Sequence, residues 1–408
     1  MSLVRDDKDQ LQRFRETLDR VCQSVPFYRE RLKQAGITGG ADIKSPDDIS
    51  RIPFTTKSDL RDNYPLGMLA VSESEVRRIH ASSGTRGKPT IAAYTQKDLH
   101  TWSELCARSL KTVGVKPGDV VQNCYGYGLF TGGLGLHQGA EHLGATIVPS
   151  STGRTQHQVM LMQDFGARVL CSTPSYALAI AEYIEQAKID RSSLKLEIGI
   201  FGAEPWSEEC RQQIESKLGI KAYDIYGLSE ILGPGVAIEC REQQGLHIWE
   251  DNFFVEVIDG ELVITTLTKE AMPLVRYRTG DVCELIDTPC KCGLPHRRIT
   301  RLNGRRDDML IIRGVNVYPC EIESIVYATH NAGTEYQIVV DRAQQLDSLL
   351  VRVECEKDEP TARRTLQEAV QSGLHQRLGL AANVEVVAPN VIPRSEGKAL
   401  RVLDLRPQ

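Results

Sequence analysis

Ala81-Ser-Ser-Gly-Thr-Arg-Gly-Lys-Pro-Thr90 is the most informative stretch of the chain. Glycine and hydroxyl side chains concentrate here, and Lys88 adds a positive charge. Backbone N–H groups of such a loop can surround an anion, and a lysine at its rim adds attraction. The stretch therefore predicts a phosphate-binding loop, with a plain turn as the alternative. It is not a Walker loop, because that pattern requires glycine where Ser82 stands and serine or threonine where Pro89 stands. The run Thr90-Ile-Ala-Ala-Tyr94 predicts the return strand of a hairpin.

Strand-like and helix-like segments alternate between residues 145 and 225. Such alternation predicts a parallel sheet covered by helices on both faces, with ligands beyond the carboxyl ends of the strands. Gly202-Ala-Glu-Pro205 and Tyr226-Gly-Leu-Ser-Glu230 each directly follow a predicted strand, so we expect both at one crevice. The predicted strands are 145–149, 169–172, 196–201 and 221–225, and the predicted helices are 155–165, 175–187 and 207–218.

The remaining segments follow other patterns. Helical spacing of apolar residues predicts a helix at 8–34 and another at 97–113. Residues 252–287 have antiparallel, barrel-like character, and residues 309–408 have the pattern of a small α+β domain. The expected elements of these two regions are strands at 254–258, 261–266, 282–286, 336–341, 348–355 and 384–387, and helices at 320–329 and 360–378.

The predicted fold class is therefore α/β. A large N-terminal domain, residues 1–304, would hold the parallel, helix-covered sheets and a small β-barrel-like subdomain at 235–303. A small α+β domain would follow at 308–408. The charged stretch Gly304-Arg-Arg-Asp-Asp308 is the expected boundary.

Composition excludes several classes of protein. The chain has 408 residues, 41% of them hydrophobic, 25% charged, and a net charge of −5. These are ordinary globular values, with no basic excess that would suggest nucleic acid and no apolar run long enough to span a membrane. No signal core follows Met1, so we expect a cytoplasmic protein. Eleven cysteines in that compartment favour free thiols or a metal site over disulfides.

Two cysteine and histidine pairs suggest such a metal site. Cys240 and His247 form one pair, and Cys290 and Cys292 form the other. Three thiolates and one imidazole suit a closed, noncatalytic, tetrahedral Zn²⁺ site. The spacing is not that of a standard zinc finger, so scattered buried thiols are the alternative. Cys283 and His296 are rival ligands.

Five motifs in order resemble those of the adenylate-forming superfamily, which includes acyl- and aryl-CoA ligases and peptide-synthetase adenylation domains. The resemblance extends along nearly the whole chain, and three further segments most closely resemble phenylacetate-CoA ligases. The five motifs are the loop at 81–90, Asp224-Ile-Tyr-Gly-Leu-Ser-Glu230, Arg276-Tyr-Arg-Thr-Gly-Asp281, Gly304–Asp308 with Arg313-Gly314, and Pro393-Arg-Ser-Glu-Gly-Lys398. The three segments are Tyr125–Gly133, Gly202–Trp206 and Gly245–Asp251.

The resemblance implies roles for particular residues. Lys398, Lys88 and Glu230 would be catalytic, with Lys398 between the acyl carboxylate and the α-phosphate and Glu230 a Mg²⁺ ligand. Asp307 would be the hinge of the C-terminal domain. ATP would contact Ser82, Ser83, Gly84, Thr85, Gly87, Lys88, Ala203, Glu204, Pro205, Asp224, Tyr226, Gly227, Ser229, Asp281 and Arg305. The acyl pocket would be built from Tyr125, Phe130, Ala203, Ile225 and Pro234.

The expected function is that of an AMP-forming aryl-CoA ligase using ATP, Mg²⁺ and coenzyme A. One alternative acceptor is a carrier protein, and a nucleotide-binding module without turnover is the alternative of another class. Binding alone would not need Lys398, which argues against that module. Two residues depart from the family pattern: Arg86 stands where a small hydroxyl residue is common, and Gly280 stands where phenylacetate-CoA ligases tend to carry arginine. The identity of the aromatic acid is left open, as is assembly into a homodimer.

Overall fold

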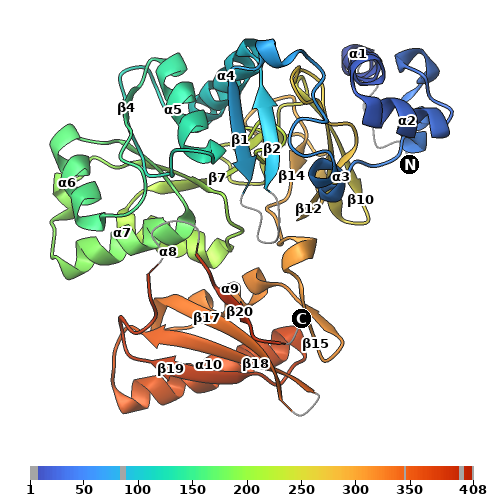
Figure 1. Cartoon of the computed structure of the whole chain (residues 1–408). Helices are drawn as coiled ribbons and strands as arrows, with labels where there is room; N and C mark the ends of the chain where they lie inside the picture. Colours follow the sequence, from blue (N-terminus) through green and yellow to red (C-terminus); the bar gives the residue numbers. More distant parts are fainter. Residues whose placement is uncertain (1–7, 83–88, 344–345, 395–398, 407–408) are drawn as a thin grey trace. The chain divides into compact units, whose positions relative to one another are not determined.

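The computed structural model describes residues 8–82, 89–343, 346–394 and 399–406 (Figure 1). The chain divides into two compact units. The first unit comprises Met1–Ser151 and Tyr223–Arg301, and the second comprises Thr152–Ala222 and Leu302–Gln408. The C-terminal segment therefore shares a unit with a segment from the middle of the chain. Along the described residues, no helix combines the length and the apolar character needed to cross a membrane.

The helix predicted at 8–34 is two helices, and proline is the reason. Pro26 occupies the first turn of the second helix, and Val25 before it has extended angles. A residue before proline is disfavoured from helical angles, so the first helix ends there. The longer helices of this unit are α1 (Lys8–Ser24), α2 (Pro26–Gln34), α4 (Gln96–Thr112) and α5 (Thr131–Leu143), with a short α3 (Lys57–Asp62).

Strands of the first unit pair in four groups. A hairpin joins β1 (Arg78–Ser82) to β2 (Thr90–Tyr94), as the sequence predicted, and β3 (Val120–Asn123) pairs in parallel with β4 (Thr146–Val148). An antiparallel series follows the order β7, β8, β9, β14, β13, and a three-stranded antiparallel sheet follows the order β10, β11, β12. Their bounds are β7 Lys221–Tyr226, β8 Ala237–Glu239, β9 Leu246–Ile248, β10 Phe253–Ile258, β11 Glu261–Thr266, β12 Tyr277–Val282, β13 Leu285–Ile286 and β14 Arg298–Ile299.

The antiparallel character predicted for residues 252–287 is confirmed, with one correction. The strand expected at 282–286 covers the last residue of β12 and the whole of β13, which belong to different sheets. Cys283 and Glu284 separate them, and the Cys283 N–H donates to the carbonyl of Gly260 in the turn between β10 and β11. The chain therefore turns away from one sheet to enter the other.

Glycines of α5 let that helix pack closely on its neighbours. A Cβ on Gly139 would lie 2.3 Å from Cβ of Cys106 in α4, and one on Gly135 would lie 2.5 Å from the Trp102 ring. Such distances are far below van der Waals contact, so only glycine fits there. Gly135 and Gly139 thus serve close packing of α5 on its neighbours.

The central part of the second unit has the predicted alternation of strands and helices. Parallel strands β5 and β6 are paired, and α7 contacts both α6 and α8. The elements are α6 (Thr155–Phe165), β5 (Val169–Ser172), α7 (Pro174–Gln186), β6 (Ile198–Gly202) and α8 (Glu208–Leu218).

The C-terminal part of the second unit is the predicted α+β arrangement. Its four-stranded sheet has the order β19, β18, β17, β20, and α9 and α10 pack together. The elements are β15 (Leu310–Ile312), β16 (Val315–Val317), α9 (Pro319–Ala328), β17 (Ala332–Ala343), β18 (Leu346–Cys355), α10 (Pro360–Leu378), β19 (Asn383–Val387) and β20 (Val402–Asp404). The short strands β15, β16 and β20 were not predicted, because three residues carry too little pattern.

Candidate active site

The β1–β2 hairpin holds the ends of the expected phosphate-binding loop. Ser82 and Thr90 face each other across the hairpin, directly before and just after the loop. Both side-chain hydroxyls are buried, and neither has a hydrogen-bond partner among the described residues. Buried polar groups are normally hydrogen-bonded. Two buried hydroxyls without a protein partner among the described residues therefore suit a polar ligand. The other predicted loop residues, Ser83, Gly84, Thr85, Gly87 and Lys88, lie outside the described residues.

The N-terminus of α5 meets this hairpin. The Ala81 N–H donates to the carbonyl of Leu129 at 3.0 Å, and Nδ1 of His80 donates to the same oxygen at 2.9 Å. Two residues later, Thr131 Oγ1 lies 3.1 Å from Ser229 Oγ. Phe130 at the helix start is therefore positioned between the loop hairpin and the Ser229-Glu230 motif.

The segment from Asp224 to Glu230 is held at its start by two contacts. The Asp224 N–H donates to Oε2 of Glu239 at 2.8 Å, and Arg301 Nε lies 3.8 Å from Asp224 Oδ2. Further along, the Tyr226 hydroxyl donates to Asp281 Oδ2 at 2.6 Å. The structure thus brings together two residues that the family resemblance assigns to the ATP site.

Asp281 lies in a strand and not in a turn. It is 2% exposed, and the pairing of β11 with β12 shifts register opposite it. Gly280 beside it has φ +81°, an angle that glycine adopts readily, and its N–H donates to Glu261 Oε1 at 3.0 Å. The bulge turns Asp281 toward Tyr226.

Lys269 was not predicted from the sequence, yet it contacts the Glu230 motif directly. Its Nζ donates to the main-chain carbonyl of Glu230 at 2.6 Å and lies 4.8 Å from the centre of the Tyr94 ring. The Tyr94 hydroxyl donates to the carbonyl of Ser229 at 2.6 Å. Lys269 is 3% exposed, and burial lowers its pKa from 10.5 to about 8. One buried cation and one buried phenol therefore hold two consecutive carbonyls of the motif.

Asp98 positions the segment that carries Lys269. Its carboxylate accepts from the N–H groups of Glu270 at 2.6 Å and Ala271 at 2.9 Å, and also from Thr95 at 2.9 Å. The Thr95–Asp98 capping box was visible as a sequence pattern, whereas the contacts across to 270–271 were not.

The four expected pocket residues of the first unit line up along α5 and β7. Tyr125 packs on Gly132, and Pro234 packs on Gly135 of the same helix. Ile225 is buried near the end of β7. Phe130 is 53% exposed, which leaves its ring free to contact a ligand. The fifth residue, Ala203, belongs to the second unit.

In the second unit, Ala203 and Glu204 directly follow β6. Ala203 has φ +70°, a left-handed angle that non-glycine residues rarely adopt and that often marks a functional position. Glu204 Oε1 accepts from the Ser175 N–H at 2.8 Å, and Oε2 accepts from the Ala399 N–H at 3.1 Å. Ala399 immediately follows Lys398, which lies outside the described residues. Pro205, next to Glu204, is partly exposed.

An ion pair joins the C-terminal part of this unit to α7, and a hydrogen bond joins it to the residue before α8. Arg394 Nη2 lies 2.7 Å from Glu182 Oε1, and its Nη1 lies 2.6 Å from Glu354 Oε1. Buried Glu323 accepts from the Ser207 N–H at 2.8 Å and from the Tyr336 hydroxyl at 2.9 Å. Burial raises the pKa of Glu323 to about 7.

The expected hinge lies in a short turn before β15. Asp307 is exposed, and its Oδ2 lies 3.6 Å from Arg305 Nη2. Gly304 has φ +129°, which only glycine adopts without strain. The boundary thus carries a conformationally free residue beside two charged side chains.

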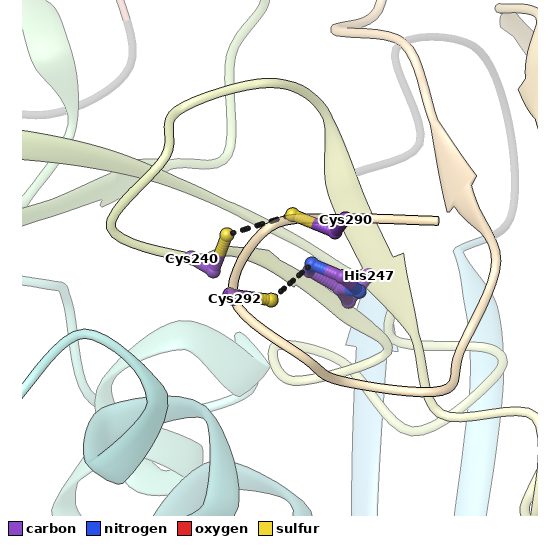
Figure 2. Close-up of side chains that lie close together, drawn as sticks. All are labelled: Cys240, His247, Cys290 and Cys292. Carbon is purple, nitrogen blue, oxygen red and sulfur yellow. Dashed lines mark hydrogen bonds between the residues drawn. The ribbon is translucent and has the colours of Figure 1, made fainter. Parts of the chain in front are cut away.

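Cys240, His247, Cys290 and Cys292 form one group, here called the Cys3His cluster. Their ligand atoms all lie within 4.8 Å of one another, and Figure 2 shows the four side chains pointing together from two separate stretches of chain. Nδ1 of His247 lies 3.2 Å from the carbonyl oxygen of His296. Cys283 and the His296 ring are not part of the group; the His296 ring packs edge-on against Trp249 at 5.3 Å.

Comparisons with known proteins place similar sequences and a similar fold beside this chain. A family model described as AMP-binding enzyme matches residues 70–252, and one described as AMP-binding enzyme C-terminal domain matches residues 314–406. A phenylacetate-coenzyme A ligase of Thermus thermophilus is 47% identical over 97% of this chain and 96% of its own length. One of Escherichia coli is 46% identical over 97% and 94%. A solved structure of 2-hydroxyisobutyryl-CoA ligase in the postadenylation state matches with a TM-score of 0.92 at 29% identity, over 98% of this chain and 89% of that one.

Proposed function

The chain belongs to the AMP-forming acid–CoA ligases, and from this premise we propose that it activates an aromatic carboxylic acid and transfers it to coenzyme A. One observation carries the proposal. Within the first unit, the loop hairpin, the start of α5 and the Ser229-Glu230 motif are tied together by direct hydrogen bonds. A phosphate loop, an acyl pocket and a carboxylate would thereby meet at one place.

The first step joins the acid to AMP. A carboxylate oxygen of the acid attacks the α-phosphorus of ATP, the bond to the bridging oxygen breaks, and pyrophosphate leaves with that electron pair. In the proposal, the 82–88 loop holds the β- and γ-phosphates, and Lys398 opposes the repulsion between the acid and the α-phosphate. Asp281, oriented by Tyr226, accepts from the ribose hydroxyls. Ala203 to Pro205 flank the adenine, and Arg305 contacts the ribose.

Oxygen donors around Glu230 fit a Mg²⁺ ion. The carboxylate of Glu230 and the hydroxyls of Ser229 and Thr131 are the ligand type that Mg²⁺ prefers, and Lys269 and Tyr94 fix the main chain beneath them. When bound, Mg²⁺ would neutralise charge on the phosphates. The full set of proposed cofactors is ATP, Mg²⁺, coenzyme A and a structural Zn²⁺ that takes no part in the chemistry.

The second step transfers the acyl group. The thiolate of coenzyme A attacks the carbonyl carbon of the adenylate, the bond to the AMP oxygen breaks, AMP leaves with that electron pair, and a thioester forms. We propose that the 308–408 domain rotates about Asp307 between the two steps, withdrawing Lys398. A cytosolic location is part of the proposal, since none of the eleven cysteines, all of which lie in the described part of the chain, is in a disulfide.

An aromatic substrate is the finer part of the proposal. Tyr125 and Phe130 offer flat surfaces, and Pro234 and Ile225 offer apolar ones. The relatives named above are phenylacetate-CoA ligases, while 2-hydroxyisobutyryl-CoA ligase is named for an aliphatic acid. Gly280 departs from the pattern of phenylacetate-CoA ligases that the chain resembles, so benzoates and aminobenzoates are included beside phenylacetate.

Pyrophosphate exchange tests the proposal. The purified chain should catalyse acid-dependent exchange of labelled pyrophosphate into ATP with phenylacetate, benzoate, 2-aminobenzoate or indole-3-acetate. Exchange should be much weaker with 2-hydroxyisobutyrate or linear fatty acids. Equal or faster exchange with the aliphatic acids would refute the aromatic assignment.

The acceptor is tested separately. With the preferred acid, coenzyme A should yield a thioester, whereas an aryl carrier domain should not be loaded. Loading of the carrier without a CoA thioester would establish the alternative function. Absence of both exchange and thioester formation with every acid would favour a module that only binds nucleotide.

A further inference from the structure

The Cys3His cluster has the dimensions of a tetrahedral metal site. Two sulfurs bound to one zinc at about 2.3 Å each lie about 3.8 Å apart, and a sulfur and a nitrogen lie slightly closer. Here the Sγ atoms of Cys240 and Cys290 are 3.6 Å apart, and Cys292 Sγ lies 3.3 Å from His247 Nε2 (Figure 2). A disulfide would need about 2.05 Å. These two distances match edges of such a tetrahedron and exclude a Cys240–Cys290 disulfide, and all four ligand atoms lie within 4.8 Å of one another.

The histidine is oriented to donate a lone pair into the cluster. Its Nδ1 faces the carbonyl oxygen of His296 at 3.2 Å, and a carbonyl can only accept a hydrogen bond. Nδ1 therefore carries the proton, and Nε2 is left with its lone pair facing Cys292. A backbone acceptor behind the distal nitrogen is the usual support for a metal-binding imidazole. Cys240 and His247 are both buried, which removes water as a competing ligand.

The loop that carries Cys290 and Cys292 lacks a core of its own. It connects β13 to β14, each only two residues long. No residue from Asp287 to Pro295 is buried. Neither buried side chains nor the short β13–β14 pairing explains why the loop keeps its two thiols against Cys240 and His247. A metal ion bound by all four side chains would hold the loop there.

We propose that the Cys3His cluster binds one structural Zn²⁺ through the Sγ atoms of its three cysteines and Nε2 of His247. Three thiolates and one imidazole in tetrahedral positions suit Zn²⁺, whereas Mg²⁺ and Ca²⁺ require oxygen ligands. Four protein ligands fill the coordination sphere, so the site is closed and does not activate water. The proposal does not depend on the reaction that the enzyme catalyses.

The zinc would also hold the approach to the nucleotide motif. In the paired strands β9 and β14, His247 lies opposite Arg298. Arg298 Nη2 donates to the Thr288 carbonyl at 2.9 Å, which ties the start of the loop to its end. Arg301, shortly after β14, pairs with Asp224. Loss of the metal should therefore loosen the loop first and the Arg301 contact second.

Metal analysis of the full chain, purified without a polyhistidine tag, tests the proposal. We expect about one zinc per chain, released when an organomercurial blocks the thiols. Cys292→Ala should bind less than about a fifth of that amount. Cys283→Ala removes a buried thiol and His296→Gln removes a ring, both close in sequence to the cluster, and both variants should keep zinc at the wild-type level.

Cobalt substitution covers the case in which Cys292→Ala fails to fold. Wild-type chain loaded with Co²⁺ should show the absorption bands of a tetrahedral, thiolate-ligated ion. Wild-type chain without zinc and without these bands would overturn the proposal. Undiminished zinc in Cys292→Ala, or a Cys240–Cys290 disulfide detected by intact mass, would also overturn it.

Discussion

Replacing Lys269 with methionine should separate positioning of the catalytic motif from stability of the fold. Methionine has nearly the same length and fills the same space, but it has no charge and no donor. The change removes the hydrogen bond to the Glu230 carbonyl and the contact with the Tyr94 ring, while Asp98 continues to hold the 270–271 backbone. We expect the Ser229-Glu230 motif to lose this hydrogen bond while the rest of the first unit stays folded.

The expected change in the free energy of unfolding for Lys269→Met follows from two opposing contributions. A hydrogen bond from a charged donor contributes about 1.5–3 kcal/mol. Against it, the lowering of the Lys269 pKa from 10.5 to about 8 corresponds to a cost of about 3 kcal/mol for keeping the charge buried. The two terms nearly cancel, so the free energy of unfolding should change by no more than about 1 kcal/mol. If the hydrogen bond is needed in the transition state, its loss slows adenylation about 10- to 150-fold.

Pyrophosphate exchange at several Mg²⁺ concentrations, combined with thermal unfolding, measures both effects. Lys269→Met should slow exchange, raise the Mg²⁺ concentration needed for half-maximal rate, and leave Tm nearly unchanged. Lys97→Met is the matched control, since Lys97 pairs with Glu270 at 2.8 Å but its side chain is 65% exposed. It should alter neither quantity. Exchange within twofold of wild type, or a fall in Tm large enough to explain the lost rate, would refute the reasoning.

Four further variants test other parts of the structure. Lys398→Ala should slow adenylation at least 100-fold, while conversion of supplied aryl-AMP and CoA to thioester stays within a few-fold; equal losses in both half-reactions would contradict the two-conformation scheme. Phe130→Ala should raise KM for the aryl acid about tenfold and leave KM for ATP unchanged, since an aromatic pair contributes about 0.5–1.5 kcal/mol beyond its buried area. Ala203→Leu should exclude ring-substituted acids by overpacking; unchanged rates across a panel of such acids would remove Ala203 from the pocket. The pKa of Glu323, raised to about 7, means that the folded chain binds this proton more tightly than the unfolded chain. Stability should therefore fall as pH rises from about 4.5 to about 7, and Glu323→Gln should flatten that part of a Tm–pH profile; an identical slope in both proteins would exclude Glu323 as its source.

Local patterns predicted much of the fold, and contacts distant in sequence explain what they missed. The alternation between residues 145 and 225 and the hairpin after the loop depend on neighbouring residues, and both were predicted. The break at Pro26 was also a local signal, but the apolar spacing on both sides of it favoured one helix. By contrast, Arg394 and Glu182 are 212 positions apart, so no local pattern indicates that 152–222 and 302–408 share a unit.

The candidate site residues also differ in whether a local sequence pattern or a contact distant in sequence reveals them. Tyr226 and Asp281 were named from separate motifs, and the structure joins them by a hydrogen bond. Lys269 had no such signal, because a single lysine after a strand is normally solvated. Its burial depends on Tyr94 and on the main chain of Glu230, which only the folded unit brings near.

The two ends of the Asp224–Glu230 segment depend on residues outside every motif that the sequence revealed. At one end, Asp224 is held by Glu239 and by Arg301, which follows the loop that carries Cys290 and Cys292. At the other end, Lys269 holds the carbonyl of Glu230. Side chains of the segment also help to hold it, since the Tyr226 hydroxyl donates to Asp281 and Ser229 Oγ lies 3.1 Å from Thr131 Oγ1. The rigidity of the segment therefore depends on contacts with the surrounding chain. The proposed structural zinc, acting through Arg301, and the buried Lys269 would be two independent supports of the segment. Loss of either one should therefore affect the same step of the reaction.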